Sequence, residues 1–194
     1  MTTPFVLGLD LDGVCSDYES GFRDHCVSLT GKPASAFGPQ THWSFQTSGW
    51  VETEREFYDL HARAVGRGLF ADMDAIDGVS KHLWALSDAD VHIRIITHRL
   101  CINGSHGRAA SDTVAWLEKH NIPYRDLCFV ADKSKVGADV YIDDAPHNVA
   151  ALRAAGGYTI VFDTLYNRDV DGPRAHSWAE VAELVLARKA ALGR

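Results

Sequence analysis

Near its start the chain carries the run Phe5-Val6-Leu7-Gly8-Leu9-Asp10-Leu11-Asp12-Gly13-Val14, an apolar strand pattern that ends in two carboxylates and a glycine. Because side chains alternate along a strand, Asp10 and Asp12 point the same way, and Gly13 lets the chain turn close beneath them. Two such acids suit a hard cation such as Mg²⁺, and one of them could attack phosphorus. An Asp-Gly turn that only closes a strand would have the same sequence. A second acidic pair, Asp143-Asp144, follows another apolar run and favours a functional site.

Short apolar runs of strand length recur along the chain and alternate with amphipathic stretches of helical length. The expected strands are 5–9, 91–97, 127–130, 139–142 and 158–162, and the helical stretches include 78–87, 108–120 and 146–155. This alternation predicts an α/β fold, a doubly wound parallel sheet of buried strands. In such sheets ligands bind beyond the carboxyl ends of the strands. The polar residues at those ends are Asp10, Asp12, Thr97, Asp143 and Asp144.

Residues 18–76 interrupt this alternation. Helical patterns cover 17–29 and 51–65, no strand pattern is evident, and glycine and proline punctuate the segment. It holds nearly half of the chain's aromatic residues, whose usual place is a core but which as a group suggest a surface for a flat ring. We therefore predict one α/β core, residues 1–17 and 77–194, with a small helical cap, residues 18–76, inserted after the first strand.

Composition excludes several classes of protein. With 194 residues and 46% hydrophobic content, the chain can bury one sizeable core. The net charge is −7 with both signs mixed along the chain, so we expect no nucleic-acid polymer as a partner. The sequence shows no apolar run of transmembrane length, the four cysteines show no CxxC spacing, and we expect no signal peptide. We therefore expect a cytoplasmic protein with reduced thiols and no membrane partner, for which a homodimer is possible.

Further reactive side chains follow the expected strands. Thr97, His98 and Arg99 close the second strand, and Lys133 follows the third. Each has an ordinary explanation, because threonine is a common strand or cap residue and lysines are usually solvated. Together with the acidic pairs, however, they comprise a nucleophile, an acid-base group, a hydroxyl, a cation and metal ligands. These are the parts that phosphoryl transfer requires.

This ordered set resembles the four motifs of the haloacid-dehalogenase-like phosphatases, a superfamily with a Rossmann-like core, over nearly the whole chain. More narrowly, the chain resembles the 5'(3')-deoxyribonucleotidase family. The motifs that carry the resemblance are Asp10-Leu11-Asp12-Gly13-Val14, Asp17-Tyr18-Glu19, Asp132-Lys133, Ile142-Asp143-Asp144, Tyr166-Asn167-Arg168 and His176-Ser177-Trp178-Ala179. The resemblance implies a Mg²⁺-dependent phosphomonoester hydrolase, a 5'-nucleotidase that acts on ribo- or deoxyribonucleoside monophosphates through an aspartyl phosphate.

The resemblance also implies the chemistry of each motif. Asp10 would be the nucleophile and Asp12 the general acid and base. Thr97 and Lys133 would hold the phosphoryl oxygens. Mg²⁺ would bind to Asp10, to the backbone carbonyl of Asp12 and to the pair Asp143-Asp144, and either member of that pair could be the direct ligand.

Substrate contacts follow from the same resemblance. Tyr18 falls where the family places an aromatic ring against the nucleobase, and Trp43 is a second aromatic for that place. His98 and Arg99 are further substrate-binding residues, at positions where eukaryotic members carry small or cyclic side chains. Two alternatives stay open: a sugar phosphate or other small phosphate ester as substrate, and a non-catalytic receiver-like regulatory module. The order of the acidic motifs, with the spaced pair first and the adjacent pair late, favours the enzyme.

Overall fold

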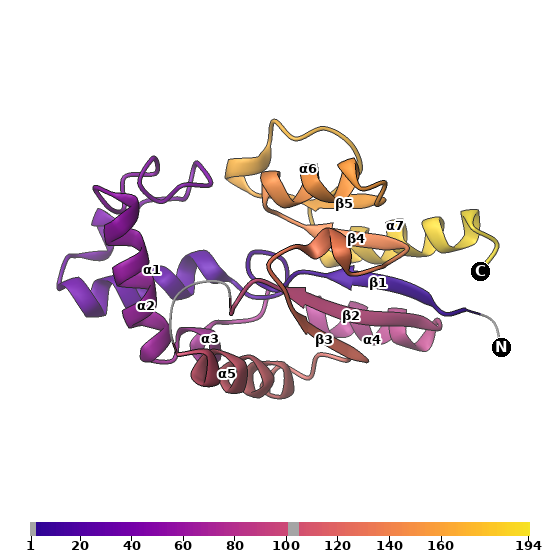
Figure 1. The fold of residues 1–194 in the computed structure, drawn as a ribbon, viewed down its shortest axis with the longest axis horizontal. Coiled ribbons are helices and arrows are strands. Elements are labelled where there is room, and N and C mark those ends of the chain that lie inside the picture. The colour runs from indigo at the N-terminus through magenta and orange to yellow at the C-terminus, as the bar shows by residue number, and fades with distance from the viewer. Residues whose placement is uncertain (1–2, 101–104) are drawn as a thin grey trace.

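The computed structural model describes residues 3–100 and 105–194, and within them the chain forms a six-stranded sheet with all strands parallel. The strand order is β3-β2-β1-β4-β5-β6, so β1 and β4 lie side by side at the centre (Figure 1). This confirms the predicted α/β fold and its doubly wound parallel sheet. The strands are β1 (Phe5–Leu9), β2 (Val91–Thr97), β3 (Asp126–Phe129), β4 (Val140–Asp143), β5 (Thr159–Phe162) and β6 (Arg174–Ala175).

Helices cover both faces of the sheet, because its central strands bury side chains on both sides. On β2, Ile95 belongs to the main core, whereas the next residue, Ile96, packs with Tyr141 and Leu152 in a smaller cluster. Helix α6 carries Leu152 and covers this smaller cluster, while α4 and α7 pack against each other over the main core. Helix α5 contributes the fully buried Trp116 to the main core. The four helices are α4 (Val79–Asp88), α5 (His106–Lys119), α6 (Pro146–Ala154) and α7 (Trp178–Ala191).

After β1 and before α4, the chain leaves the sheet and forms helices that lie to one side of it (Figure 1). The Asp17 side chain accepts a hydrogen bond from the backbone N–H of Ser20 and so caps the start of α1. Thr53 caps the start of α2 in the same way. The helices are α1 (Tyr18–Thr30), η1 (Ala34–Ala36), α2 (Glu54–Gly66) and α3 (Leu69–Asp72).

The two ends of this helical segment run side by side. Residues 15–17 pair with residues 74–76 through an isolated antiparallel bridge between Ser16 and Ala75 and through backbone hydrogen bonds on either side of that bridge. The helical segment is therefore attached to the sheet by a short two-stranded neck.

Some elements differ from the prediction. The buried strand predicted over 127–130 is instead the half-buried strand β3, because it forms an edge of the sheet. The strand β6 and the helices α3 and α7 have no counterpart in the sequence prediction. With two residues, β6 is too short to carry a periodic pattern.

Two further predictions concern the state of the cysteines and the membrane-spanning character of the helices. Cys15 and Cys26 are buried free thiols and Cys128 is a half-buried one, while Cys101 lies outside the described residues. Among residues 3–100 and 105–194, no helix has the length and apolar character needed to cross a membrane.

Candidate active site

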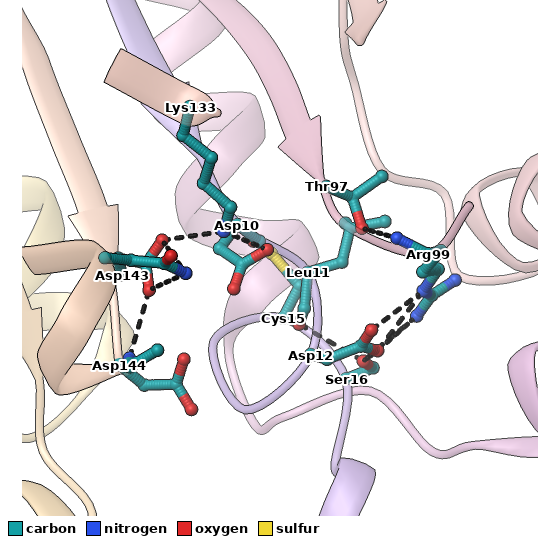
Figure 2. A network of polar contacts seen from close by, with 12 residues as sticks. Asp10, Leu11, Asp12, Cys15, Ser16, Thr97, Arg99, Lys133, Asp143 and Asp144 are labelled. Atoms are coloured by element: carbon teal, nitrogen blue, oxygen red, sulfur yellow. Dashed lines mark hydrogen bonds and ion pairs between the residues drawn. The ribbon is translucent and has the colours of Figure 1, made fainter. Parts of the chain in front are cut away.

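The carboxyl ends of β1 and β4 meet at the centre of the sheet, where the strand order reverses. Asp10 follows β1 and Asp143 ends β4, and the backbone N–H of Asp10 donates to the Ile142 carbonyl at 3.1 Å. Lys133 is the first residue of the short 3-10 turn η2 (Lys133–Lys135). Asp132 caps this turn by accepting a hydrogen bond from a backbone N–H at 3.0 Å. Figure 2 shows the three side chains pointing toward one another.

Lys133 supplies the positive charge of this centre. Its Nζ lies 2.7 Å from Asp10 Oδ1 and 2.7 Å from Asp143 Oδ2, and its side chain is 4% exposed. Burial by itself lowers the pKa of a lysine, but the two carboxylates outweigh burial and hold the pKa of Lys133 above its ordinary value. The side chain is therefore an ammonium group fixed between two acids.

The acids outnumber this ammonium group. Asp10, Asp143 and Asp144 each offer an oxygen within 4.8 Å of the others. Burial raises the pKa of Asp10 to about 7 although Lys133 opposes the shift, and burial with the neighbouring carboxylates raises the pKa of Asp144. Asp144 Oδ1 is buried and has no hydrogen-bond partner among the described residues. Three close carboxylates with an unpaired buried oxygen fit a hard divalent cation, which prefers carboxylate ligands.

Neighbouring groups orient the late acidic pair. Asp143 Oδ1 accepts hydrogen bonds from a backbone N–H at 3.0 Å and from Asn148 Nδ2 at 3.1 Å. The Tyr166 hydroxyl donates to Asp144 Oδ2. Gly13 adopts a φ of 79°, and a side chain on it would overlap the Asp144 carboxylate. The glycine of the first motif therefore leaves the space that the second motif occupies.

Asp12 lies in a different environment from Asp10, and in Figure 2 the two carboxylates turn toward different cations. Arg99 Nη2 donates to Asp12 Oδ1 at 2.7 Å, and Arg99 Nε lies 3.2 and 3.1 Å from the two carboxylate oxygens. The Ser16 hydroxyl donates to Oδ1 at 3.0 Å. Burial raises the pKa of Asp12, but the charge of Arg99 and the hydrogen bonds from Arg99 and Ser16 outweigh burial. The pKa therefore lies below its ordinary value.

Thr97 and His98 border the same centre. Thr97 ends β2, is buried, and its hydroxyl oxygen accepts a hydrogen bond from the backbone N–H of Arg99 at 3.3 Å. His98 Nε2 is buried without a hydrogen-bond partner in the part of the chain that the structure describes. Burial and the charge of Lys133 lower the pKa of His98 to about 4. At neutral pH, His98 therefore offers an uncharged imidazole rather than a cation.

The two predicted base-binding aromatics lie in the helical segment. Tyr18 begins α1 and stacks on Phe22, with ring centroids 5.6 Å apart and planes at 22°. Trp43 is 47% exposed, and its ring lies 4.9 Å from that of His147 and 5.6 Å from that of Tyr166. Because Tyr166 also bonds to the acid cluster, Trp43 brings the helical segment against the border of that cluster.

The structure gathers Asp10, Asp143, Asp144 and Lys133 into one cluster, but it gives Arg99 contacts that the sequence does not indicate. Arg99 is predicted to bind substrate, yet its side chain is fully buried against protein groups. Sequence reasoning also missed two residues that hold carboxylates in place. Ser16 has no signal beyond its spacing of four residues from Asp12, whereas Tyr166 lies within a motif that carries the family resemblance.

Comparisons of the sequence with known proteins point to one family. Residues 4–191 match the family model described as 5' nucleotidase, deoxy (pyrimidine), cytosolic type C protein. A protein of Chlorobaculum tepidum named as a 5'(3')-deoxyribonucleotidase is 45% identical over 184 residues, 94% of this chain and 90% of that one. The human mitochondrial 5'(3')-deoxyribonucleotidase is 24% identical over 200 residues, 93% of this chain and 82% of that one.

Solved structures share the fold. A haloacid dehalogenase-like family hydrolase from Streptococcus pneumoniae superposes with a TM-score of 0.65 at 17% identity, over 95% of this chain and 99% of that one. A second such hydrolase, from Xanthomonas campestris, gives a TM-score of 0.59 at 19% identity, with both chains fully covered. By its sequence the chain belongs to the family of 5' nucleotidases of the deoxy (pyrimidine), cytosolic type C, and its fold is that of the haloacid dehalogenase-like hydrolases.

Proposed function

We propose that this chain is a Mg²⁺-dependent 5'(3')-deoxyribonucleotidase that hydrolyses nucleoside monophosphates through a phosphoryl group carried on Asp10. Family membership supports the nucleotidase activity. The observation that carries the mechanism is the position of Asp10, which lies 2.7 Å from the Lys133 ammonium group and beside the pair Asp143-Asp144. A nucleophilic carboxylate needs such surroundings, because a phosphate dianion otherwise repels it.

The metal would bind to the three carboxylates described above and to the backbone carbonyl of Asp12. The unpaired oxygen of Asp144 and the raised pKa of Asp10 support this assignment. When bound, Mg²⁺ would supply positive charge against the phosphate dianion. The side chain of Asp12 is paired with Arg99, which is consistent with a backbone contribution from Asp12.

The protein's own residues then account for both halves of the reaction. Lys133 and the Thr97 hydroxyl hold the phosphoryl oxygens while an Asp10 oxygen bonds to phosphorus. The bond from phosphorus to the leaving oxygen breaks, and Asp12 gives that oxygen a proton, a step for which Asp12 must first be protonated against the charge of Arg99. In the second half, Asp12 takes a proton from water, the water oxygen attacks the phosphorus of the aspartyl phosphate, and phosphate leaves Asp10 regenerated.

The helical segment 18–76 would act as the cap that recognises the nucleoside. Tyr18 and Trp43 offer flat rings for the base, and Trp43 lies at the border of the acid cluster. His98 would add an uncharged hydrogen-bonding group next to the phosphate site, because its Nε2 lacks a partner among the described residues. These contacts would favour nucleotides over phosphate esters that lack a base.

A substrate panel tests this proposal. Phosphate release with Mg²⁺ is measured on 5'- and 3'-deoxyribonucleotides, ribonucleotides, sugar phosphates and p-nitrophenyl phosphate. We expect kcat/KM to be highest for a nucleotide. Tyr18→Ala should lower kcat/KM for nucleotides by about tenfold or more, the loss of one stacking contact of roughly 1 to 3 kcal/mol, and should affect p-nitrophenyl phosphate much less.

Tyr58→Ala is the matched control, because Tyr58 is 43% exposed on α2. A wild-type preference for sugar phosphates over every nucleotide would overturn the nucleotidase assignment and leave the phosphatase chemistry in place. Equal losses on both substrates in Tyr18→Ala would show that Tyr18 only packs the cap.

A further inference from the structure

Arg99 is a buried cation, and each of its three guanidinium nitrogens donates to a protein group. Its side chain is 0% exposed. Nε and Nη2 donate to the carboxylate of Asp12, Nη2 also lies 3.3 Å from the Ser16 hydroxyl, and Nη1 donates to the Thr113 hydroxyl of α5 at 3.2 Å. Each nitrogen of the guanidinium group therefore contacts the protein, and the main acceptor is a single carboxylate.

Aromatic rings hold the guanidinium group in this orientation. Arg99 Cζ lies 4.5 Å from the centroid of the Phe70 ring and 5.8 Å from that of Trp116. A planar guanidinium group stacks on aromatic faces and presents a rigid fork that matches a carboxylate, which a lysine cannot reproduce. Phe70 belongs to α3 and Trp116 to α5, so groups from two elements fix the arginine that fixes Asp12.

The positive charges of the site divide its acids into two sets. Lys133 contacts Asp10 and Asp143, whereas Arg99 contacts Asp12. If Asp12 lacked this partner, its carboxylate would be free to turn toward Lys133 and toward a metal bound at the acid cluster. Arg99 therefore keeps one carboxylate out of the cluster and available for another task.

We propose that Arg99 is a positioning residue that acts through Asp12, holding the acid-base carboxylate in place for proton transfer, and that it does not bind the phosphate. This inference rests on the proposed phosphatase function. It assigns to Arg99 a role different from the substrate contact that the sequence predicts.

A double-mutant cycle tests the inference. Arg99→Met, Arg99→Lys, Asp12→Asn and Asp12→Asn/Arg99→Met are compared with wild type in kcat and KM on a nucleoside monophosphate that wild type hydrolyses. Arg99→Met should lower kcat by about 10- to 100-fold, as small misplacements of a catalytic group do, with KM changed by less than about twofold. Arg99→Lys should recover part of the loss. Adding Arg99→Met to Asp12→Asn should cause no further loss, because the group that Arg99 positions is already gone.

A second substrate separates positioning from general damage. p-Nitrophenolate leaves without a proton, so the penalty of Arg99→Met on aspartyl phosphate formation, measured as the burst of p-nitrophenolate, should be smaller than on nucleotide cleavage. Arg55→Met is the matched control, since Arg55 is 92% exposed and pairs with the exposed Asp59 on α2, and it should leave kcat and KM unchanged. If Arg99→Met does not fold, Ser16→Ala replaces it in the cycle, because Ser16 donates to the same carboxylate.

The outcomes are distinguishable. A higher KM with unchanged kcat in Arg99→Met, or a further loss in the Asp12→Asn background, would mean that Arg99 contacts substrate or serves the fold, and would overturn the inference alone. So would an Arg99→Met enzyme with wild-type kinetics. A wild-type protein that releases no phosphate from any ester would overturn the proposed function, and the inference with it.

Discussion

Asp10 and Asp12 are the same residue type two positions apart, yet the fold shifts their pKa values in opposite directions. Burial raises the pKa of Asp10 to about 7, whereas Arg99 and Ser16 hold the pKa of Asp12 below its ordinary value despite its burial. Two carboxylates whose surroundings push their pKa values apart can perform two different tasks. A raised pKa marks a carboxylate whose burial outweighs the nearby positive charge, and a lowered pKa marks a carboxylate whose cationic partner outweighs burial.

Asp10→Asn should remove activity without weakening the fold. Loss of a nucleophile costs several orders of magnitude in kcat. The pKa of Asp10 rises from 3.8 to about 7 on folding, so its favourable contribution to the free energy of unfolding is fully present below pH 3.8 and is lost as the pH rises through about 7. An uncharged amide does not suffer this loss. In metal-free buffer at pH 8 the variant should melt at or above the wild-type temperature.

Phosphate release and thermal melting check this prediction, with the exposed Asp59→Asn as the control that should change neither. Near-normal turnover in Asp10→Asn would remove Asp10 from the role of nucleophile. A variant that melts well below wild type at pH 8 would contradict the explanation of the raised pKa.

At the scale of elements, helix α2 carries a buried histidine against an aromatic cluster. His61 is 2% exposed, its Nδ1 has no hydrogen-bond partner among the described residues, and its ring lies 5.6 Å from that of Phe57 and 5.9 Å from that of Phe70. Burial lowers its pKa to about 4, although the charge of Asp12 opposes the shift. The helix therefore packs with a neutral imidazole, and protonation opposes that packing.

His61→Phe should make the protein less sensitive to acid. Because the pKa falls from 6.5 to about 4 on folding, the unfolded chain binds the proton more tightly, and the free energy of unfolding falls as the pH drops from 6.5 toward 4. The loss is about 2 kcal/mol between pH 7.5 and pH 5. Thermal or urea unfolding at the two pH values measures it. His61→Phe should lose less stability than wild type over this range, and the exposed His42→Gln should lose as much as wild type; equal losses in all three proteins would refute the assignment.

Apolar runs in the sequence predict the strands that are buried in the sheet. The apolar runs of β1, β2, β4 and β5 lie inside the sheet, and each strand falls within one residue of its predicted range. The edge strand β3 has a similar composition but is half-buried, because position in the sheet, and not sequence, decides its exposure. The two residues of β6 form a strand because they pair with β5, which no local pattern can predict.

At the scale of the whole molecule, the strand order concentrates negative charge at the carboxyl ends of the central strands β1 and β4. Metal binding should therefore stabilise the entire fold. At pH 7.5, Mg²⁺ in about 100-fold excess over its dissociation constant should add roughly 3 kcal/mol to the free energy of unfolding, seen as a rise of several degrees in Tm. Asp144→Asn should abolish most of this rise, whereas Asp59→Asn should leave it intact.

Chelation of the metal should also abolish phosphate release, and added Mg²⁺ should restore it. Full activity in excess chelator would point to a metal-free mechanism. A Tm that does not respond to Mg²⁺ would separate any effect of the ion on activity from binding at the acid cluster.

The sequence predicts the part of the site that topology determines. Asp10 and Asp143 end strands that the doubly wound order makes neighbours, so recognising the strands is enough to bring the acids together. Arg99 is different, because it meets Asp12 across 87 residues and its orientation depends on rings from α3 and α5. No spacing rule encodes a contact that forms only when two helices pack beside a loop.

The two-stranded neck between residues 15–17 and 74–76 has a consequence for how such proteins diversify. A segment whose ends already lie side by side can be lengthened, shortened or exchanged without straining the sheet to which it is joined. The sequence and length of the helical segment can then change with the substrate, while the residues of the reaction centre stay in place. In this chain that freedom is limited, because Ser16 belongs both to the neck and to the groups that contact Asp12. A protein in which the insert is replaced must therefore keep a hydrogen-bond donor at this position of the neck.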